Sequence, residues 1–402
     1  MKITRGYKTE LDLNNKQETL CLQHAGTARF AYNWALAKKI EAYKAGIKVP
    51  TAIDLHKELN KLKQTELLWM YHVSKCAPQE ALRNVDKAYD NFFRKVKLKK
   101  QLKHKGKLGF PKFKKKNKGI GSFRLTGAIK VFPNAIQLPR LGKLRFKEHE
   151  YLPTDVHILS ATVSEQAGRW FVSIQVEEER AEQTNTATTA IGVDLGVHTL
   201  ATCSDGATFA NPHSLKQKLK KLKRLQRAHS RKQKGSKNRE KSRKKLAKLH
   251  ARIANIRKDS IHKFTTHVCK NHAYVAIEDL HVAGMLKNHH LAQSIADSSF
   301  GEIRRQITYK AEKFGTHVVV IDRFYPSSKT CSSCGWMNEN LDLSQRVFVC
   351  VECGYLADRD YNAAKNILAV SSTASNACGA GSSGLFSEQV KLPALKQERN
   401  II

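Results

Sequence analysis

Residues 190–204 read AIGVDLGVHTLATCS, and this stretch decides the fold. Apolar side chains run up to Asp194, glycines lie two residues before it and two residues after it, and a second apolar run follows. This pattern predicts a buried strand that ends at Asp194 and continues through residues 198–210 as an antiparallel meander. A carboxylate at the end of a buried strand must be paired or bound to a metal, because desolvating an isolated charge is costly.

Two further acidic residues occupy comparable positions far along the chain. Glu278 ends the apolar run YVAIE, and Asp360 opens a predicted helix, so the three acids lie 84 and 82 residues apart. Each alone has an ordinary explanation, as a turn aspartate, a helix cap or a first-turn charge. Together, in the order strand Asp, strand Glu, helix Asp, they predict oxygen ligands for Mg²⁺ or Mn²⁺. Asp358 and Asp279 are rival carboxylates that rank second.

Such a group of carboxylates is typical of nucleases with an RNase H fold. Two metal ions about 3.5–4 Å apart would activate a water and stabilise the leaving oxygen of a phosphodiester. Ala363 and Ala364 would allow the last helix to lie close to the sheet and direct Asp360 towards the other two acids.

A second pattern concerns four cysteines spaced C-x2-C-x15-C-x2-C, with a glycine after each pair. They are Cys331, Cys334, Cys350 and Cys353. Four thiolates fill a tetrahedral zinc shell and leave no open position for catalysis, so we expect one structural Zn²⁺ rather than four unligated thiols. The other cysteines are scattered and the N-terminus lacks an apolar signal-peptide core, which favours a reducing cytoplasm.

Positive charge is concentrated in two blocks. The chain has 71 Lys and Arg against 35 Asp and Glu, a net charge of +36. Residues 94–118 hold 13 basic residues and no acid, and residues 215–258 hold 20 basic residues against one acid, so the blocks carry +13 and +19. Dense charge of one sign predicts a polyanion partner better than a solubility role, because each neutralised phosphate releases counterions. Neither block has the apolar face of an interfacial helix, and no apolar run approaches the about 18 residues of a membrane span.

The remaining pattern predicts several modules. Residues 1–13 predict a strand, residues 16 to about 100 predict helices, and residues 121–180 predict the short strands of a small antiparallel barrel. The second basic block predicts two long helices broken at residues 234–238. Residues 371–402 lack any recognisable motif and begin with a low-complexity run, so we expect a disordered tail.

Six motifs, in their order and spacing, resemble those of the TnpB family, which are RNA-guided nucleases of insertion sequences related to type V CRISPR effectors. The motifs are GTARFAYN at 26–33, GFPKFKKK at 109–116, GVDLG at 192–196, IEDL at 277–280, YPSSKTCSSCG at 325–335 and DRDYNAAKNI at 358–367. The resemblance extends over nearly the whole chain to about Asn366.

The resemblance implies a multidomain α+β fold, in which a wedge-type β-barrel is interrupted by a helical recognition domain and followed by a nuclease domain. The implied boundaries are 1–15 and 121–182 for the barrel, 16–120 for the helical domain, 187–329 and 355–370 for the RNase H-like (RuvC) α/β domain, and 330–354 for an inserted zinc ribbon. It also implies that Asp194, Glu278 and Asp360 are catalytic, and it favours Asp360 over Asp358.

The implied partners are a guide RNA derived from the transposon end and double-stranded target DNA, cut beside a short motif that the protein reads. The candidate nucleic-acid contacts are Arg29, Tyr32, Asn33, Lys112, Lys114, Lys115, Lys220, Lys221 and Arg224. Two other functions remain open: an RNA-guided DNA-binding regulator that does not cut, against which the intact carboxylates argue, and a transposase. Phe110, Phe113 and Phe123 lie among basic residues and could stack on bases, although core packing is the commoner fate of Phe.

Overall fold

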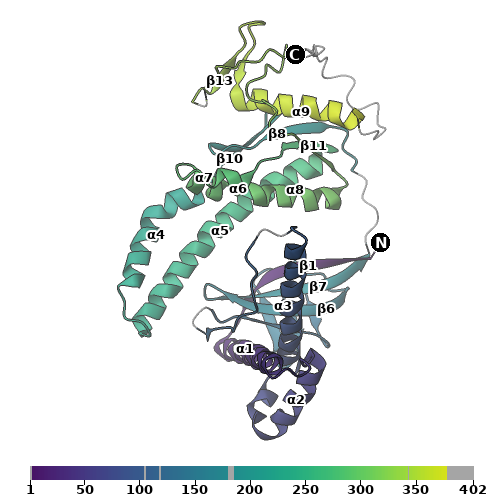
Figure 1. Ribbon diagram of the computed structural model, residues 1–402, viewed down its shortest axis with the longest axis vertical. Coiled ribbons are helices and arrows are strands. Elements are labelled where there is room, and N and C mark those ends of the chain that lie inside the picture. Colours follow the sequence, from purple (N-terminus) through teal and green to yellow (C-terminus); the bar gives the residue numbers. More distant parts are fainter. Residues whose placement is uncertain (1, 104–105, 117–118, 180–184, 343, 378–402) are drawn as a thin grey trace. The chain divides into compact units, whose positions relative to one another are not determined.

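The structure is a computed structural model that describes residues 2–103, 106–116, 119–179, 185–342 and 344–377 (Figure 1). Its contacts divide the chain into two compact units, Met1–Arg180 and Ala181–Ile402. Each unit is described by itself. In the described ranges, no helix is both long and apolar enough to cross a membrane.

The first unit is built on a seven-stranded antiparallel sheet. The strands are β1 (Lys2–Asp12), β2 (Ser122–Leu125), β3 (Lys130–Phe132), β4 (Ala135–Leu138), β5 (Gly142–Phe146), β6 (His157–Gln166) and β7 (Arg169–Glu179), and their order across the sheet is β2-β6-β7-β1-β5-β4-β3. The N-terminal strand therefore lies between strands that are more than 120 residues away in the sequence. All of the predicted short strands form.

Helices pack on this sheet and share its core. They are α1 (Asn15–Lys44), α2 (Ala52–Thr65), the 3₁₀ helix η1 (Leu68–His72) and α3 (Cys76–Lys100). The side chain of Asn14 accepts a hydrogen bond from the Gln17 backbone N–H, and the Gln17 side chain accepts from the Asn14 N–H, so a capping box begins α1. Leu36 of α1, Leu82 of α3 and Ile174 of β7 belong to one buried cluster.

The expected barrel is an open sheet in the described part of the unit, because the two edge strands, β2 and β3, are not paired with each other. Helices α1 and α3 cover the β2 edge instead, and His24 of α1 packs against Phe123 of β2 with ring centroids 5.0 Å apart. An edge strand that is covered by helices does not need a partner strand. The same packing buries Phe123, so the suggestion that this ring stacks on bases is wrong.

The second unit contains a five-stranded mixed sheet of order β10-β9-β8-β11-β12. The strands are β8 (Ala190–Asp194), β9 (Thr199–Cys203), β10 (Thr208–Ala210), β11 (Tyr274–Glu278) and β12 (His317–Ile321). Strands β8, β9 and β10 form the predicted antiparallel meander, and β11 pairs in parallel with both β8 and β12. This arrangement is consistent with the expected RuvC-like fold and places the ends of β8 and β11 side by side.

Helices cover both faces of this sheet (Figure 1). Helix α9 (Arg359–Ala377) lies on one face, and α5 (Lys237–Asn271) and α8 (Phe300–Phe314) lie on the other. The alternation of β11 follows this division: Val275 and Ile277 pack in the cluster of α5 and α8, and Ala276 packs against Ile367 of α9.

The second basic block forms a helical hairpin of α4 (Ser214–Ser230) and the first half of α5, and the turn at residues 231–236 lies close to the predicted break. Leu222, Leu249 and Ile253 form the apolar seam of the hairpin. The second half of α5 enters the core of the sheet through Ile261 and Phe264. One continuous helix thus belongs to both the hairpin and the core of the sheet.

The last elements are the short helices α6 (Val282–Met285) and α7 (Ala292–Ser298) and the two-stranded ribbon of β13 (Val347–Val349) and β14 (Leu356–Asp358). Helix α9 continues to Ala377, so the expectation of disorder is wrong for residues 371–377. The hydroxyls of Ser371 and Ser372 donate to the carbonyls of Leu368 and Ala369, so these polar side chains find acceptors within the helix. The rest of the expected tail lies outside the described residues.

Candidate active site

Asp194 lies at the end of β8, where the last helix approaches the sheet. A Cβ atom at Gly192 would lie 2.7 Å from the backbone nitrogen of Leu368 and would also collide with the carbonyl oxygen of Ala364. Only glycine therefore allows α9 to pack directly on β8. The buried Ala363 and Ala364 provide the matching small surface on the helix, as the sequence predicts.

Glu278 lies at the end of the neighbouring parallel strand. Its carboxylate accepts a hydrogen bond of 2.6 Å from the hydroxyl of Ser327. Burial raises the pKa of Glu278 and the Ser327 hydrogen bond opposes this rise. The adjacent Asp279 forms ion pairs with Arg304 and Arg323 instead, and their hydrogen bonds lower its pKa.

Asp360 lies in the first turn of α9. The Oδ1 atom of Asp358 accepts hydrogen bonds from the backbone N–H groups of Asp360 at 2.9 Å and Tyr361 at 3.0 Å, so Asp358 caps the helix. The carboxylate of Asp360 is free of this task and lies 3.4 Å from Arg359 and 3.6 Å from Arg346. Asp279 and Asp358, the two alternatives to the predicted acids, thus both have structural partners.

The three predicted carboxylates influence one another electrostatically. Burial raises the pKa of Asp194 to about 8, and the negative charges of Glu278 and Asp360 add to this rise, while Arg359 opposes it. Among the residues that the structure describes, the four thiols are the group whose ligand atoms converge within 4.8 Å. The three carboxylates are therefore close enough to influence one another, but they are spaced more widely than the four thiols. An oxygen donor set whose members repel one another fits a divalent cation.

The four predicted cysteines come together in two matching turns. The Sγ atoms of Cys331 and Cys353 are 3.8 Å apart, and those of Cys334 and Cys350 are 3.5 Å apart. In each turn the N–H of the glycine after the pair donates to the carbonyl of the first cysteine at 3.0 Å. That glycine, for example Gly354, has a positive φ. The donor set fits a metal ion such as zinc.

Two asparagines that the sequence analysis did not assign connect this ribbon to α9. The Asn362 side chain donates to the Thr330 carbonyl at 2.7 Å and accepts from the Ser332 N–H at 2.9 Å. Asn366, one turn later, donates to the carbonyls of Ser327 and Thr330. Two buried asparagines four residues apart in an apolar helix were the signal in the sequence, because buried polar groups need partners.

The candidate nucleic-acid contacts separate into two groups. Lys220, Lys221 and Arg224 are exposed on α4. In the first unit, three of the candidates pack against one another: Asn33 forms two hydrogen bonds with the backbone of Lys114, whose ammonium lies 4.1 Å from the centroid of the Tyr32 ring.

The remaining candidates of the first unit differ in exposure. Tyr32 is buried at 6% exposure, and Arg29 donates to the carbonyl of Ile120 at 3.5 Å. Lys112 and Lys115 are exposed. The positions available to a polyanion are therefore the exposed lysines and the α4 group.

Comparison with known proteins identifies the family. Three family profiles match, described as "Helix-turn-helix domain" at residues 1–48, "Probable transposase" at 173–289 and "Cas12f1-like, TNB domain" at 300–367. The protein named "Putative RNA-guided DNA endonuclease InsQ" of Escherichia coli (strain K12) is 37% identical over 387 residues, which cover 92% of each chain. "TnpB-like protein L79" of Acanthamoeba polyphaga mimivirus is 34% identical over 142 residues, 34% of this chain and 26% of that protein.

The chain belongs to the TnpB family. In this TnpB protein, the range matched by the helix-turn-helix profile holds strand β1 and the single helix α1. A solved structure entitled "Structure of the mini-RNA-guided endonuclease CRISPR-Cas_phi3" shares 10% identity with a TM-score of 0.46 and covers 92% of both chains.

Proposed function

We propose that this TnpB protein is an RNA-guided DNA endonuclease encoded by an insertion sequence. The observation that carries the proposal is that Asp194, Glu278 and Asp360 come from distant segments of the chain and yet influence one another electrostatically. Asp360 does so from the first turn of the last helix. Support comes from the relative of 37% identity, whose name describes an RNA-guided DNA endonuclease.

Asp194, Glu278 and Asp360 would hold Mg²⁺ or Mn²⁺. When bound, such ions activate a water and stabilise the leaving oxygen of a phosphodiester. Residues around the acids would hold them in place. Ser327 orients the Glu278 carboxylate, and the Asp358 cap fixes the first turn of α9. Arg359 and Arg346 hold Asp360 at the edge of the site.

The four cysteines would hold one structural zinc ion. Because α9 carries both Asp360 and the asparagines that bind the ribbon, the ribbon would support the acidic site without taking part in chemistry. Metal analysis should give about one zinc per chain, and Cys331→Ser should lower both zinc content and stability. Zinc-free protein of equal stability would contradict this role.

Sequence recognition would be divided between the RNA and the protein. In guided nucleases the RNA pairs with the target, and the protein reads a short flanking motif and the shape of the duplex. The +13 and +19 blocks provide a sequence-independent grip on phosphate, as such a mechanism requires. We assign reading of the flanking motif to the first unit and derivation of the guide RNA to the transposon end.

The test begins with the RNA that copurifies with the protein from cells. Once it is sequenced, its guide segment is replaced so that two guides match two plasmids that share one flanking motif. Cutting should follow the guide, and Asp194→Ala should bind both plasmids without cutting. Cutting that ignores the guide would instead indicate a site-specific nuclease or a transposase, the activity named in one matching family description.

A further inference from the structure

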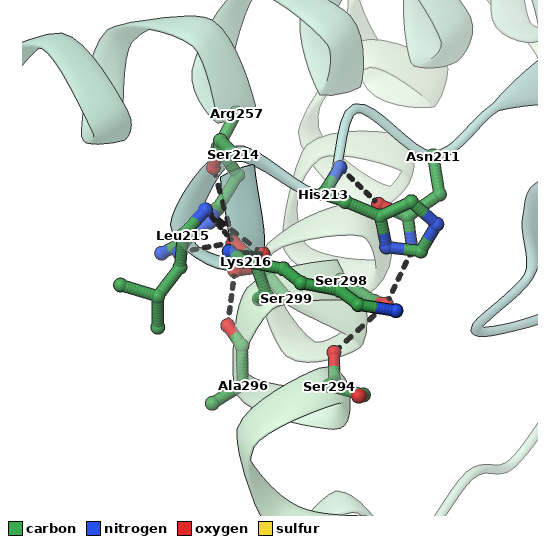
Figure 2. A network of polar contacts seen from close by, with 11 residues as sticks. Asn211, His213, Ser214, Leu215, Lys216, Arg257, Ser294, Ala296, Ser298 and Ser299 are labelled. Carbon is green, nitrogen blue, oxygen red and sulfur yellow. Dashed lines mark hydrogen bonds and ion pairs between the residues drawn. The ribbon is translucent and has the colours of Figure 1, made fainter. Parts of the chain in front are cut away.

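Asp297, at the end of α7, holds the base of the basic hairpin although it is distant from it in sequence. Its carboxylate accepts hydrogen bonds from the Ser214 hydroxyl at 3.0 Å, the Leu215 N–H at 2.9 Å and the Arg257 guanidinium at 2.7 Å. Figure 2 shows Ser214, Leu215 and Arg257 gathered at this point from α4 and α5. The side chain is buried, with 4% of its surface exposed.

This carboxylate replaces a missing helix cap. The residue before α4, His213, has a φ of 42° and makes no side-chain capping bond. The first N–H groups of a helix need acceptors, and a carboxylate at this end is also favoured by the helix dipole. Burial would raise the pKa of Asp297, but the hydrogen bonds from Arg257, Ser214 and Leu215 lower it overall. The group is therefore held as an anion.

A second set of contacts leads from the same place to the acidic site. The side-chain amide of Asn211 donates to the Ser298 hydroxyl at 2.9 Å and to the Val197 carbonyl at 2.7 Å. Ser298 is the neighbour of Asp297, and Val197 lies in the loop that leaves Asp194. Figure 2 shows Asn211 and Ser298 joined in this way. Asn211 is itself buried, at 8% exposure.

Arg257 occupies the joint of α5. The seam of the hairpin ends at Ile253, and the contacts of α5 with the nuclease core begin at Ile261. An ion pair at this joint fixes the direction in which α5 leaves the core: the stretch from Arg257 back to Lys237 is about 30 Å long at 1.5 Å per residue. A small rotation here would move the far end of the hairpin by many ångströms.

We propose that Asp297 and Asn211 are positioning residues that hold the basic hairpin and the loop after Asp194 in one fixed arrangement. Resting on the proposed function, this inference means that nucleic acid bound along α4 and α5 reaches the carboxylates in a single orientation. Neither residue contacts the reacting atoms. Their effect on cleavage passes through the hairpin and through the backbone that carries Asp194.

The first test does not depend on cleavage. Hydrogen exchange of the full-length protein is measured for the peptide that spans residues 195–199 in wild type, Asp297→Asn and Asn211→Ala. In both variants this loop should exchange about tenfold faster or more, because loss of the contacts of Asp297 or Asn211 opens local structure. The matched control is Asp205→Asn, which likewise replaces an aspartate by its amide, but at an exposed turn in the same unit, where Oδ1 accepts a hydrogen bond from the Ala207 N–H. It should leave the loop unchanged.

The second test uses the copurified RNA and a matching plasmid. Asp297→Asn should slow single-turnover cleavage about tenfold to a hundredfold, since a misplacement of about 1 Å can cost roughly a hundredfold in rate. RNA affinity and its dependence on salt should change less than about twofold, because the charges of the hairpin are intact. Arg257→Gln should reproduce the defect, and the double variant should be little worse than either single one.

The outcomes separate the two proposals. Wild-type exchange in the 195–199 loop of both folded variants overturns this inference, whatever the cleavage assay gives. Faster exchange there in both variants supports it, even if the wild-type protein fails to follow a guide, in which case the proposed function fails alone.

Discussion

At the scale of the residue, the two aspartates at the start of α9 should have separable roles. Asp360→Ala removes a proposed metal ligand and should reduce cleavage by about a thousandfold or more, since metal ions contribute several kcal/mol to the transition state. Asp358→Ala removes a helix cap and should cost about 1 kcal/mol of stability. Single-turnover cleavage and thermal unfolding measure the two effects. Near-normal cleavage by Asp360→Ala would overturn its assignment.

The raised pKa of Asp194 predicts how the metal-free protein responds to pH. A folded value of about 8 lies above the unfolded value of about 3.9, so folding takes up a proton between these limits. The contribution of Asp194 to stability is fully present below about pH 4 and is lost as pH rises towards about 8. Above that pH it should stay constant.

Thermal unfolding of zinc-loaded protein without Mg²⁺ or Mn²⁺ tests this expectation. Asp194→Asn should remove the part of the pH dependence that lies between about pH 4 and 8. The affinity of the wild-type protein for Mg²⁺ should rise over the same window, because binding must displace the proton. The same pH dependence in both proteins would show that Asp194 does not titrate there.

Individual residues were predictable from the sequence only where a pattern separated them from their neighbours. Strand ends marked Asp194 and Glu278, but Asp358 and Asp360 both open the same helix, and the hydrogen bonds that divide their tasks depend on backbone geometry. No sequence pattern marked Asp297, because its partners lie more than 80 residues away in α4 and 40 residues away in α5.

At the scale of the element, the contact between β8 and α9 can be tested by adding one methyl group. Gly192→Ala would place a Cβ atom 2.7 Å from the Leu368 nitrogen and 2.9 Å from its Cβ, and overpacking of this kind costs about 1–3 kcal/mol or more. We expect a lower melting temperature and slower cleavage, since the displaced helix carries Asp360. Gly301→Ala in α8 is the control, because no heavy atom lies within 4 Å of its added methyl.

The control variant should be neutral or slightly stabilising, since alanine favours a helix by about 1 kcal/mol over glycine. Equal melting temperatures for Gly192→Ala and Gly301→Ala would show that α9 does not depend on this close approach. Elements were well predicted where the apolar period was long, as in the two helices of the second basic block and the meander. The end of α9 was missed because the serine-rich run could be read as a linker, whereas its hydroxyls bond within the helix.

At the scale of the whole molecule, the first unit shows what the sequence could not decide. Short alternating strands predict an antiparallel sheet, but closure into a barrel depends on whether the two edge strands meet. In the described residues the β2 edge is covered by α1 and α3, so helices and sheet share one core. Such packing between distant segments leaves no local pattern in the sequence.

The charge of the hairpin should appear directly in the salt dependence of RNA binding. Lys220, Lys221 and Arg224 are exposed on α4, and each phosphate contact contributes about 0.7–0.9 to the slope of log K against log salt. Replacing all three by Gln should therefore lower the magnitude of the slope by roughly 2–3 and weaken binding most at low salt. Gln226→Ala, an exposed change on the same helix without loss of charge, should leave the slope unchanged. If the triple variant keeps the wild-type slope, these side chains do not contact phosphate, and the grip on RNA must lie elsewhere, with the exposed lysines of the +13 block next to be tested.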